Sequence, residues 1–136
     1  MNSELFSGVS LIHRLPPTRH NQIVQAITLD IEQLKDVTLD DPELMREVLA
    51  ALIDDTTRQL EFLDRAVKQL DADETVRLAH YSKGACANVG AASTAGILQL
   101  IERKAREGDF GACDEYMRSL RTEFGKLQTE AAGLTS

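Results

Sequence analysis

Residues 41–70 decide the fold, and they read DPELMREVLAALIDDTTRQLEFLDRAVKQL. The stretch begins with three helix-start signals, because Asp41 can cap a helix, Pro42 suits the first helical position and Glu43 makes the first turn acidic. Apolar residues then recur mostly at steps of three or four: Leu44, Val48, Leu52, Leu60, Leu63, Val67 and Leu70. This period predicts one amphipathic helix from Pro42 to about Leu70, roughly 40 Å long at about 1.5 Å per residue.

Start and stop signals continue on both sides of this helix. A capping box of Asp30 and Gln33 predicts a short helix before it. The expected long helices after it are 72–89, which Asp71 caps and Gly90 ends, then 91–107, which Gly108 ends, and a last helix that Asp109 caps. Four long helices with short connections predict an all-α fold, an antiparallel up-down-up-down four-helix bundle with a short extra N-terminal helix.

The domain organisation follows from where the helical period starts and stops. We expect the bundle over residues 26–131. Residues 1–25 show no persistent period, which predicts an N-terminal extension that is partly disordered or loosely packed on the domain. The small and polar residues 132–136 predict a frayed tail. Since the chain starts at Met1 and the extension is too short for another domain, we expect a free-standing protein.

Composition bounds the class of protein. The 136 residues fit one domain, and only 4% are aromatic, so aliphatic side chains must fill the core. A net charge of −7 without any run of Lys or Arg argues against binding to nucleic acid or to an anionic membrane. No segment is apolar for long enough to span a bilayer, and residues 1–20 lack the pattern of a secretory signal.

The cysteines and histidines indicate the cellular compartment and whether a metal site is expected. Cys86 and Cys113 lie in segments with a helical period, so we expect two buried, reduced thiols in a cytoplasmic protein, with a single disulfide as the alternative. His13 and His20 lack further ligands at zinc-binding spacing, which predicts no metal site. No additional apolar stripe stands out, and this favours a monomer.

The segment LAHYSKGACANVGA, residues 78–91, carries the chemistry. Helical spacing places His80 on the outward face. An imidazole that is neutral has a free ring nitrogen, which can attack phosphorus as a nucleophile. Lys83, one turn later, can place a positive charge beside a transferred phosphoryl group. Gly84 leaves bare backbone, so that the active site of a partner can close over the imidazole.

Each of these residues also has a plain structural explanation. A histidine on the surface of a helix is usually only solvated. Gly84 could allow a neighbouring helix to pack closely, and Lys83 could be one more solubilising charge. The pattern alone does not choose between these explanations.

With its surroundings, the segment resembles the histidine-containing phosphotransfer domain of multistep two-component relays. The family's Ala-His-x-Leu-Lys-Gly motif, followed by Gly-Ala, is similar to Ala79-His80-Tyr81-Ser82-Lys83-Gly84 and Gly90-Ala91. Matches in register at 29–31, 41–44 and 101–109 extend the resemblance to about residues 28–130. Ser82 and Thr94 depart from the pattern, because the family prefers large apolar residues there. This departure concerns packing more than chemistry, and we expect the Ser82 hydroxyl to bond to the Leu78 carbonyl.

The resemblance implies a phosphocarrier that has no kinase activity and binds no cofactor of its own. A phosphorylated receiver domain, from a response regulator or a hybrid histidine kinase, would dock over His80 and bring its own Mg²⁺ and phosphoaspartate. Nε2 of His80 would attack in line and later pass the group to a second receiver. Glu102 would hold the other ring nitrogen, and a plain surface ion pair with Arg106 is the alternative for this glutamate. The docking surface implied around His80 comprises Val76, Arg77, Ala87, Asn88, Ala91 and Arg106.

Two other functions compete with the phosphocarrier. The first is a helical adaptor that docks a receiver domain without transferring phosphate. The second is a purely structural bundle whose motif arose by chance. The intact combination of His80, Lys83 and Gly84 favours the phosphocarrier, because an adaptor has no need of the imidazole.

Overall fold

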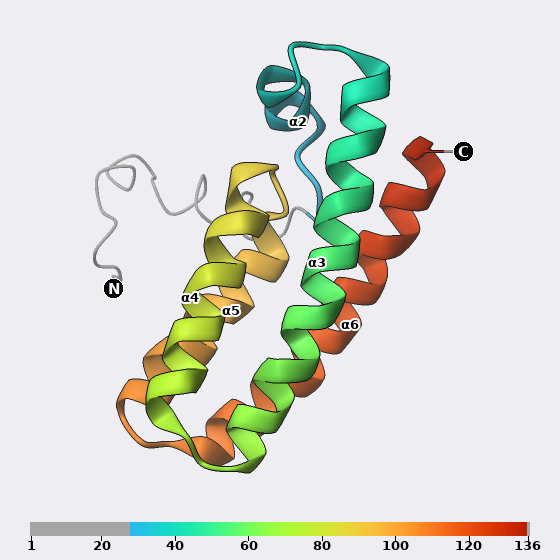
Figure 1. Ribbon diagram of the computed structural model, residues 1–136. Helices are drawn as coiled ribbons and strands as arrows, with labels where there is room; N and C mark the ends of the chain where they lie inside the picture. Colours follow the sequence, from blue (N-terminus) through green and yellow to red (C-terminus); the bar gives the residue numbers. More distant parts are fainter. Residues whose placement is uncertain (1–27, 136) are drawn as a thin grey trace, which may run out of the picture.

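The computed structural model describes residues 28–135, and every regular element within them is a helix. The elements are α2 (Ile31–Val37), α3 (Pro42–Lys68), α4 (Ala72–Asn88), α5 (Ala92–Arg106) and α6 (Phe110–Thr135). Each of the four long helices packs against the next one in the sequence, and α6 also contacts α3 (Figure 1). The predicted all-α four-helix bundle with a short helix in front is therefore confirmed. The extension predicted at 1–25 lies outside the described residues.

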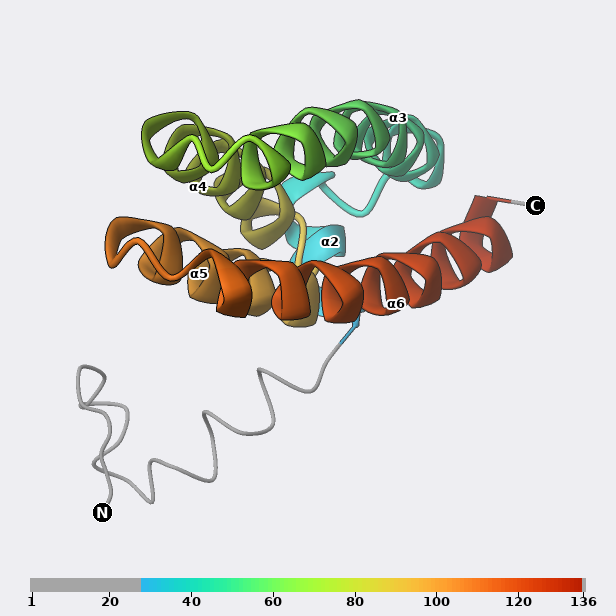
Figure 2. The ribbon, with the colours of Figure 1, turned by 90° about the horizontal axis from the view of Figure 1, so that it is seen from below.

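The long helices form two layers, α3 with α4 and α5 with α6 (Figure 2). At 27 and 26 residues, α3 and α6 are longer than α4 and α5, which have 17 and 15 residues. The short helix α2 lies beside the part of α3 that extends beyond α4 (Figure 1). The last helix, α6, continues as far as Thr135, into the segment 132–136 for which the sequence predicts a frayed tail. Buried Ala131 anchors this last part of α6 to the core, and alanine favours the helix.

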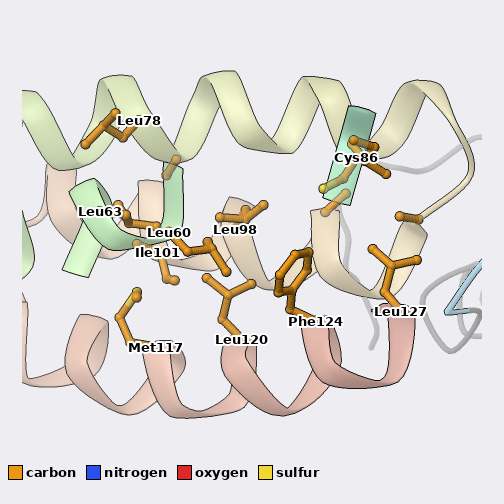
Figure 3. Close-up of a cluster of buried hydrophobic side chains, with 14 of the residues drawn as sticks. Leu60, Leu63, Leu78, Cys86, Leu98, Ile101, Met117, Leu120, Phe124 and Leu127 are labelled. Atoms are coloured by element: carbon orange, nitrogen blue, oxygen red, sulfur yellow. The ribbon is translucent and has the colours of Figure 1, made fainter. Parts of the chain in front are cut away.

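Aliphatic side chains fill the core between the layers (Figure 3). The largest side chains with no exposed surface include Leu34, Leu49, Leu63, Leu98, Ile101, Leu120 and Leu127. Both cysteines are free and buried, and burial raises the pKa of the Cys86 thiol to about 11. A thiol with so high a pKa stays protonated at neutral pH and is a poor nucleophile. In the part of the chain that the structure describes, no helix is long and apolar enough to cross a membrane.

Four helices end in the same hydrogen-bonded motif. After each, a residue takes a positive φ, and the N–H of the next residue donates to the carbonyl five positions before it, as Ala91 N does to the Cys86 carbonyl at 2.9 Å. This is the Schellman motif, which glycine favours because it has no Cβ. The residues with positive φ at these four ends are Leu39 with the following Asp40, then Leu70, Gly90 and Gly108. Leu70, the last residue of the apolar period predicted for this helix, lies in the turn after α3 and is 66% exposed.

The start of α2 is fixed to the end of α4. Asp30 caps α2 as predicted, accepting a hydrogen bond from Gln33 N at 3.2 Å. The reciprocal half of the predicted capping box is wrong, since the Gln33 side chain donates to the Ala87 carbonyl at 2.6 Å instead. The Asp30 N–H does not need Gln33, because it donates to the Gly90 carbonyl at 2.7 Å.

Two buried hydroxyl groups in the bundle lack a hydrogen-bond partner among the described residues, those of Ser82 and Thr94. The predicted bond from Ser82 to the Leu78 carbonyl is therefore wrong. Both residues stand at inward positions, and Thr94 has no exposed surface. A buried hydroxyl without a partner costs about 1–3 kcal/mol in proteins.

We expect Thr94→Val to raise the free energy of unfolding by about 1 kcal/mol, since valine has the same shape and removes the unpartnered oxygen. Thr75→Val is the matched control. Thr75 is equally buried, but its hydroxyl donates to the Asp71 carbonyl at 2.7 Å, so its replacement should lower stability by about 1 kcal/mol. Urea unfolding followed by circular dichroism measures both changes. Equal destabilisation in the two variants would show that the Thr94 hydroxyl is satisfied.

Candidate functional site

The antiparallel packing of α4 on α5 brings His80 next to Glu102. Asp71 starts α4 by accepting a hydrogen bond from Glu74 N at 3.1 Å, and this sets the faces of the helix. The inward face carries Ala79 and Cys86, both without exposed surface, and the His80 side chain is 67% exposed. Nδ1 of His80 lies 3.3 Å from Oε2 of Glu102, which is the distance of a long hydrogen bond.

Glu102 is the centre of this cluster, and its side chain is only 9% exposed. Arg106 donates to the same oxygen as His80, Oε2, at 2.6 Å. Lys83 Nζ lies 3.0 Å from the other oxygen, Oε1, as an ion pair. The carboxylate therefore has three neighbours that favour its negative charge.

The pKa of Glu102 reflects this surrounding. Burial is the largest single influence and by itself raises the pKa of the carboxyl group. The contact with Lys83 and its charge, followed by those of His80, lower the pKa by more, so that it falls below its ordinary value. Glu102 is consequently a carboxylate at neutral pH, and it can accept a hydrogen bond from an N–H of the imidazole.

Both alternatives for Glu102 occur together in the structure. The sequence left open whether this residue orients the imidazole or pairs with Arg106, and its Oε2 atom contacts both. The contact of Lys83 with Oε1 was missed. Spacing on one helix could not reveal it, because Lys83 and Glu102 lie on different helices.

The contact with Glu102 determines which ring nitrogen of His80 is available. A carboxylate accepts only from a protonated nitrogen, so Glu102 favours the tautomer with hydrogen on Nδ1. Nε2 then carries the free lone pair. Lys83 and Arg106 bring two positive charges next to the ring against one negative charge from Glu102. The site can therefore present a nucleophilic nitrogen in positive surroundings that suit an anionic group.

Gly84 and the predicted docking residues are at least partly exposed, with one exception. A Cβ at Gly84 would meet nothing within 4 Å outside its own helix, so this part of α4 is open. Arg77, Ala87, Asn88 and Arg106 are exposed, and Val76 is half-buried. Ala91 was expected on the docking surface, but it has no exposed surface. The prediction failed because α4 ends at Asn88, and the turn at Gly90 directs Ala91 into the core.

A polar contact between α3 and α4 was not predicted. The Tyr81 hydroxyl donates to Asp55 Oδ2 at 2.9 Å, and this hydrogen bond raises the pKa of Tyr81. Tyr81 is 52% exposed, so it belongs to the surface next to His80 and not to the core. No sequence signal marks the pair, since 26 positions separate the two residues.

No group of three His, Cys, Asp or Glu side chains within residues 28–135 is placed to hold a metal ion. A groove between α3 and α6 has a largely apolar lining that includes Leu49, Ile53 and Ala131. None of its lining residues belongs to α4 or α5, so it is separate from the cluster around Glu102.

Comparison with known proteins identifies a family model and two solved structures that are similar to this chain. A family model described as "Hpt domain" matches residues 47–130. The structure is similar to that of histidine-containing phosphotransfer protein B from Pseudomonas aeruginosa PAO1, with a TM-score of 0.74 and 24% identity over 79% of this chain and 94% of that one. It is also similar to a rice protein provisionally described as a histidine-containing phosphotransfer protein, with a TM-score of 0.73 and 18% identity over 95% and 94% of the two chains. At these identities the two structures show a common fold. No curated protein matches the chain.

Proposed function

This chain belongs to the Hpt domain family, and on that premise we propose that it carries a phosphoryl group on His80 between the aspartates of receiver domains. One observation supports the proposal above all others. The His80 ring is exposed, and its Nδ1 atom is directed to the Glu102 carboxylate, which leaves Nε2 toward the surface as the nucleophile. The proposed partners are receiver domains of response regulators or hybrid histidine kinases, in the cytoplasm.

The proposed step is an in-line displacement at phosphorus. The Nε2 lone pair forms a bond to the phosphorus of a receiver phosphoaspartate, and the bond from phosphorus to the aspartate oxygen breaks, leaving a free carboxylate. The ring becomes positively charged, and Glu102 stabilises that charge through Nδ1–H. The reverse step transfers the group to the aspartate of a second receiver. The Mg²⁺ that assists transfer would come with the receiver, and this chain would supply neither nucleotide nor kinase activity.

The neighbours of His80 are assigned complementary roles. Lys83 Nζ, held beside the ring by Glu102 Oε1, would stabilise the charge of the phosphoryl group. Gly84 would admit the partner's active site. Arg77, Ala87, Asn88 and Arg106, with half-buried Val76, would form the docking surface. We leave out Ala91, because its side chain is buried.

Intact-mass spectrometry after incubation with phosphoramidate tests the proposal. The protein should gain one phosphoryl group, which acid removes and which peptide mapping assigns to His80. A protein that stays unmodified, or that is modified at another residue, would contradict the proposal. The adaptor function would then be the one to test, by titration with a panel of receiver domains.

Gly84→Ala should have opposite effects on the stability of the protein and on the docking of its partner. Because nothing lies within 4 Å of the added methyl group beyond its own helix, alanine should raise the free energy of unfolding by about 1 kcal/mol. The same methyl group would stand where the partner approaches, so transfer from a phosphorylated receiver should slow, and modification by phosphoramidate should not. Gly125→Ala on α6 is the control, since it is equally unobstructed and belongs to another helix. Equal transfer rates for the two variants would exclude the proposed role of Gly84.

A further inference from the structure

Two donors share one oxygen atom of Glu102. Arg106 reaches Oε2 at 2.6 Å, whereas His80 Nδ1 lies 3.3 Å from the same atom. The usual N–H···O distance is about 2.9–3.0 Å, so the arginine contact is short and the histidine contact is long. Lys83 contacts the carboxylate at Oε1 and does not take part in this sharing.

The shared oxygen weakens the bond that orients the imidazole. A guanidinium group bound to Oε2 takes up one of its acceptor directions and reduces the negative potential that reaches Nδ1–H. Burial strengthens such electrostatic effects, and the Glu102 side chain is 9% exposed. The Arg106 side chain is 57% exposed, so its position depends on contacts at the surface.

We propose that Arg106 is a positioning residue, which competes with His80 for Oε2 of Glu102 and thereby limits the population of the tautomer that has its lone pair on Nε2. This inference rests on the proposed function, since the tautomer matters for transfer only if His80 is the nucleophile. It adds that anything which withdraws Arg106 from Glu102 prepares His80 for attack.

The test is the ratio of the two neutral tautomers of His80, measured from the ¹⁵N shifts of its ring at a pH where the ring is neutral. Arg106→Met keeps an unbranched apolar stem in place of the arginine stem but cannot donate. We expect it to raise the ratio of the Nδ1–H to the Nε2–H form by about threefold, because the freed carboxylate oxygen can then accept fully from Nδ1–H. The His80→Gln variant identifies the resonances among those of the three histidines.

Lys83→Met is the matched control. It removes one positive charge from the same carboxylate but leaves the sharing at Oε2 unchanged. Arg106→Lys, which keeps a donor, should return the ratio toward the wild-type value. An effect of Arg106→Met clearly above that of Lys83→Met supports the competition. Equal effects, or no effect of Arg106→Met, would overturn it. The measurement involves no phosphoryl transfer, so a failure of the proposed function would appear in the phosphoramidate experiment and not here.

Discussion

His80→Gln is expected to abolish the acceptance of a phosphoryl group, with a rate reduced more than about a thousandfold. Glutamine has no nitrogen lone pair available for attack, because the lone pair of its amide nitrogen is delocalised into the carbonyl group. Its amide can still donate to Glu102, and it is a good helix former, so the bundle should keep its structure. Intact-mass spectrometry with phosphoramidate measures the change, and circular dichroism checks the fold.

The two other histidines provide the control for this result. A variant with both His13→Gln and His20→Gln retains His80, and it should be modified to the same extent as the wild type. Loss of modification in that variant, or equal modification of His80→Gln and wild type, would show that the acceptor is elsewhere.

Gly90→Ala should lower the free energy of unfolding by about 3 kcal/mol, the largest effect on stability that we expect from a single methyl group in this protein. Gly90 has a φ of +88°, which an L-residue adopts only with strain. A Cβ there would lie 2.7 Å from the Asp30 carbonyl oxygen and 2.9 Å from Asp30 Cβ. Relief of this clash would break the hydrogen bond from Asp30 N to the Gly90 carbonyl and detach the start of α2.

Gly108→Ala separates the backbone strain at positive φ from the clash with Asp30. Gly108 ends α5 in the same motif with a φ of +75°, but its added Cβ would meet nothing within 4 Å. This variant should lose only about 1 kcal/mol, because it has the strain without the clash. Urea unfolding of both variants gives the difference. If Gly90→Ala lowers the free energy of unfolding by no more than Gly108→Ala does, the start of α2 moves away from the added methyl group without loss of stability.

The sequence predicted the helices well because their boundaries depend on local chemistry. Asp41 with Pro42, and the glycines at 90 and 108, act within one turn of themselves, so no knowledge of the fold is needed to interpret them. The residues Leu39 and Leu70 also take a positive φ after their helices, but leucine gives no signal for it. The apolar period therefore extended the predicted helix to about Leu70, whereas α3 ends at Lys68.

The candidate site was predicted in part. His80, Lys83 and Gly84 follow from spacing on one helix and from a short motif. The contact between Glu102 and His80 joins two residues that are 22 positions apart in sequence. It therefore depends on how α4 and α5 are placed against each other. Helical periodicity does not contain that register. For the same reason it could not show that Ala91 enters the core once α4 has ended.

The lowered pKa of Glu102 bears on how the unmodified protein can be recovered. A glutamate ordinarily titrates near 4.5, and the folded protein keeps this one charged below that value. Its contribution to folding is complete above the unfolded pKa and is lost only as the pH falls through the lower, folded value. A phosphoryl group on a histidine nitrogen is itself released by acid. If the proposed phosphoryl group is released by acid at a pH above that lower value, the ion pairs around Glu102 should therefore persist, and the acceptor would be reusable without refolding.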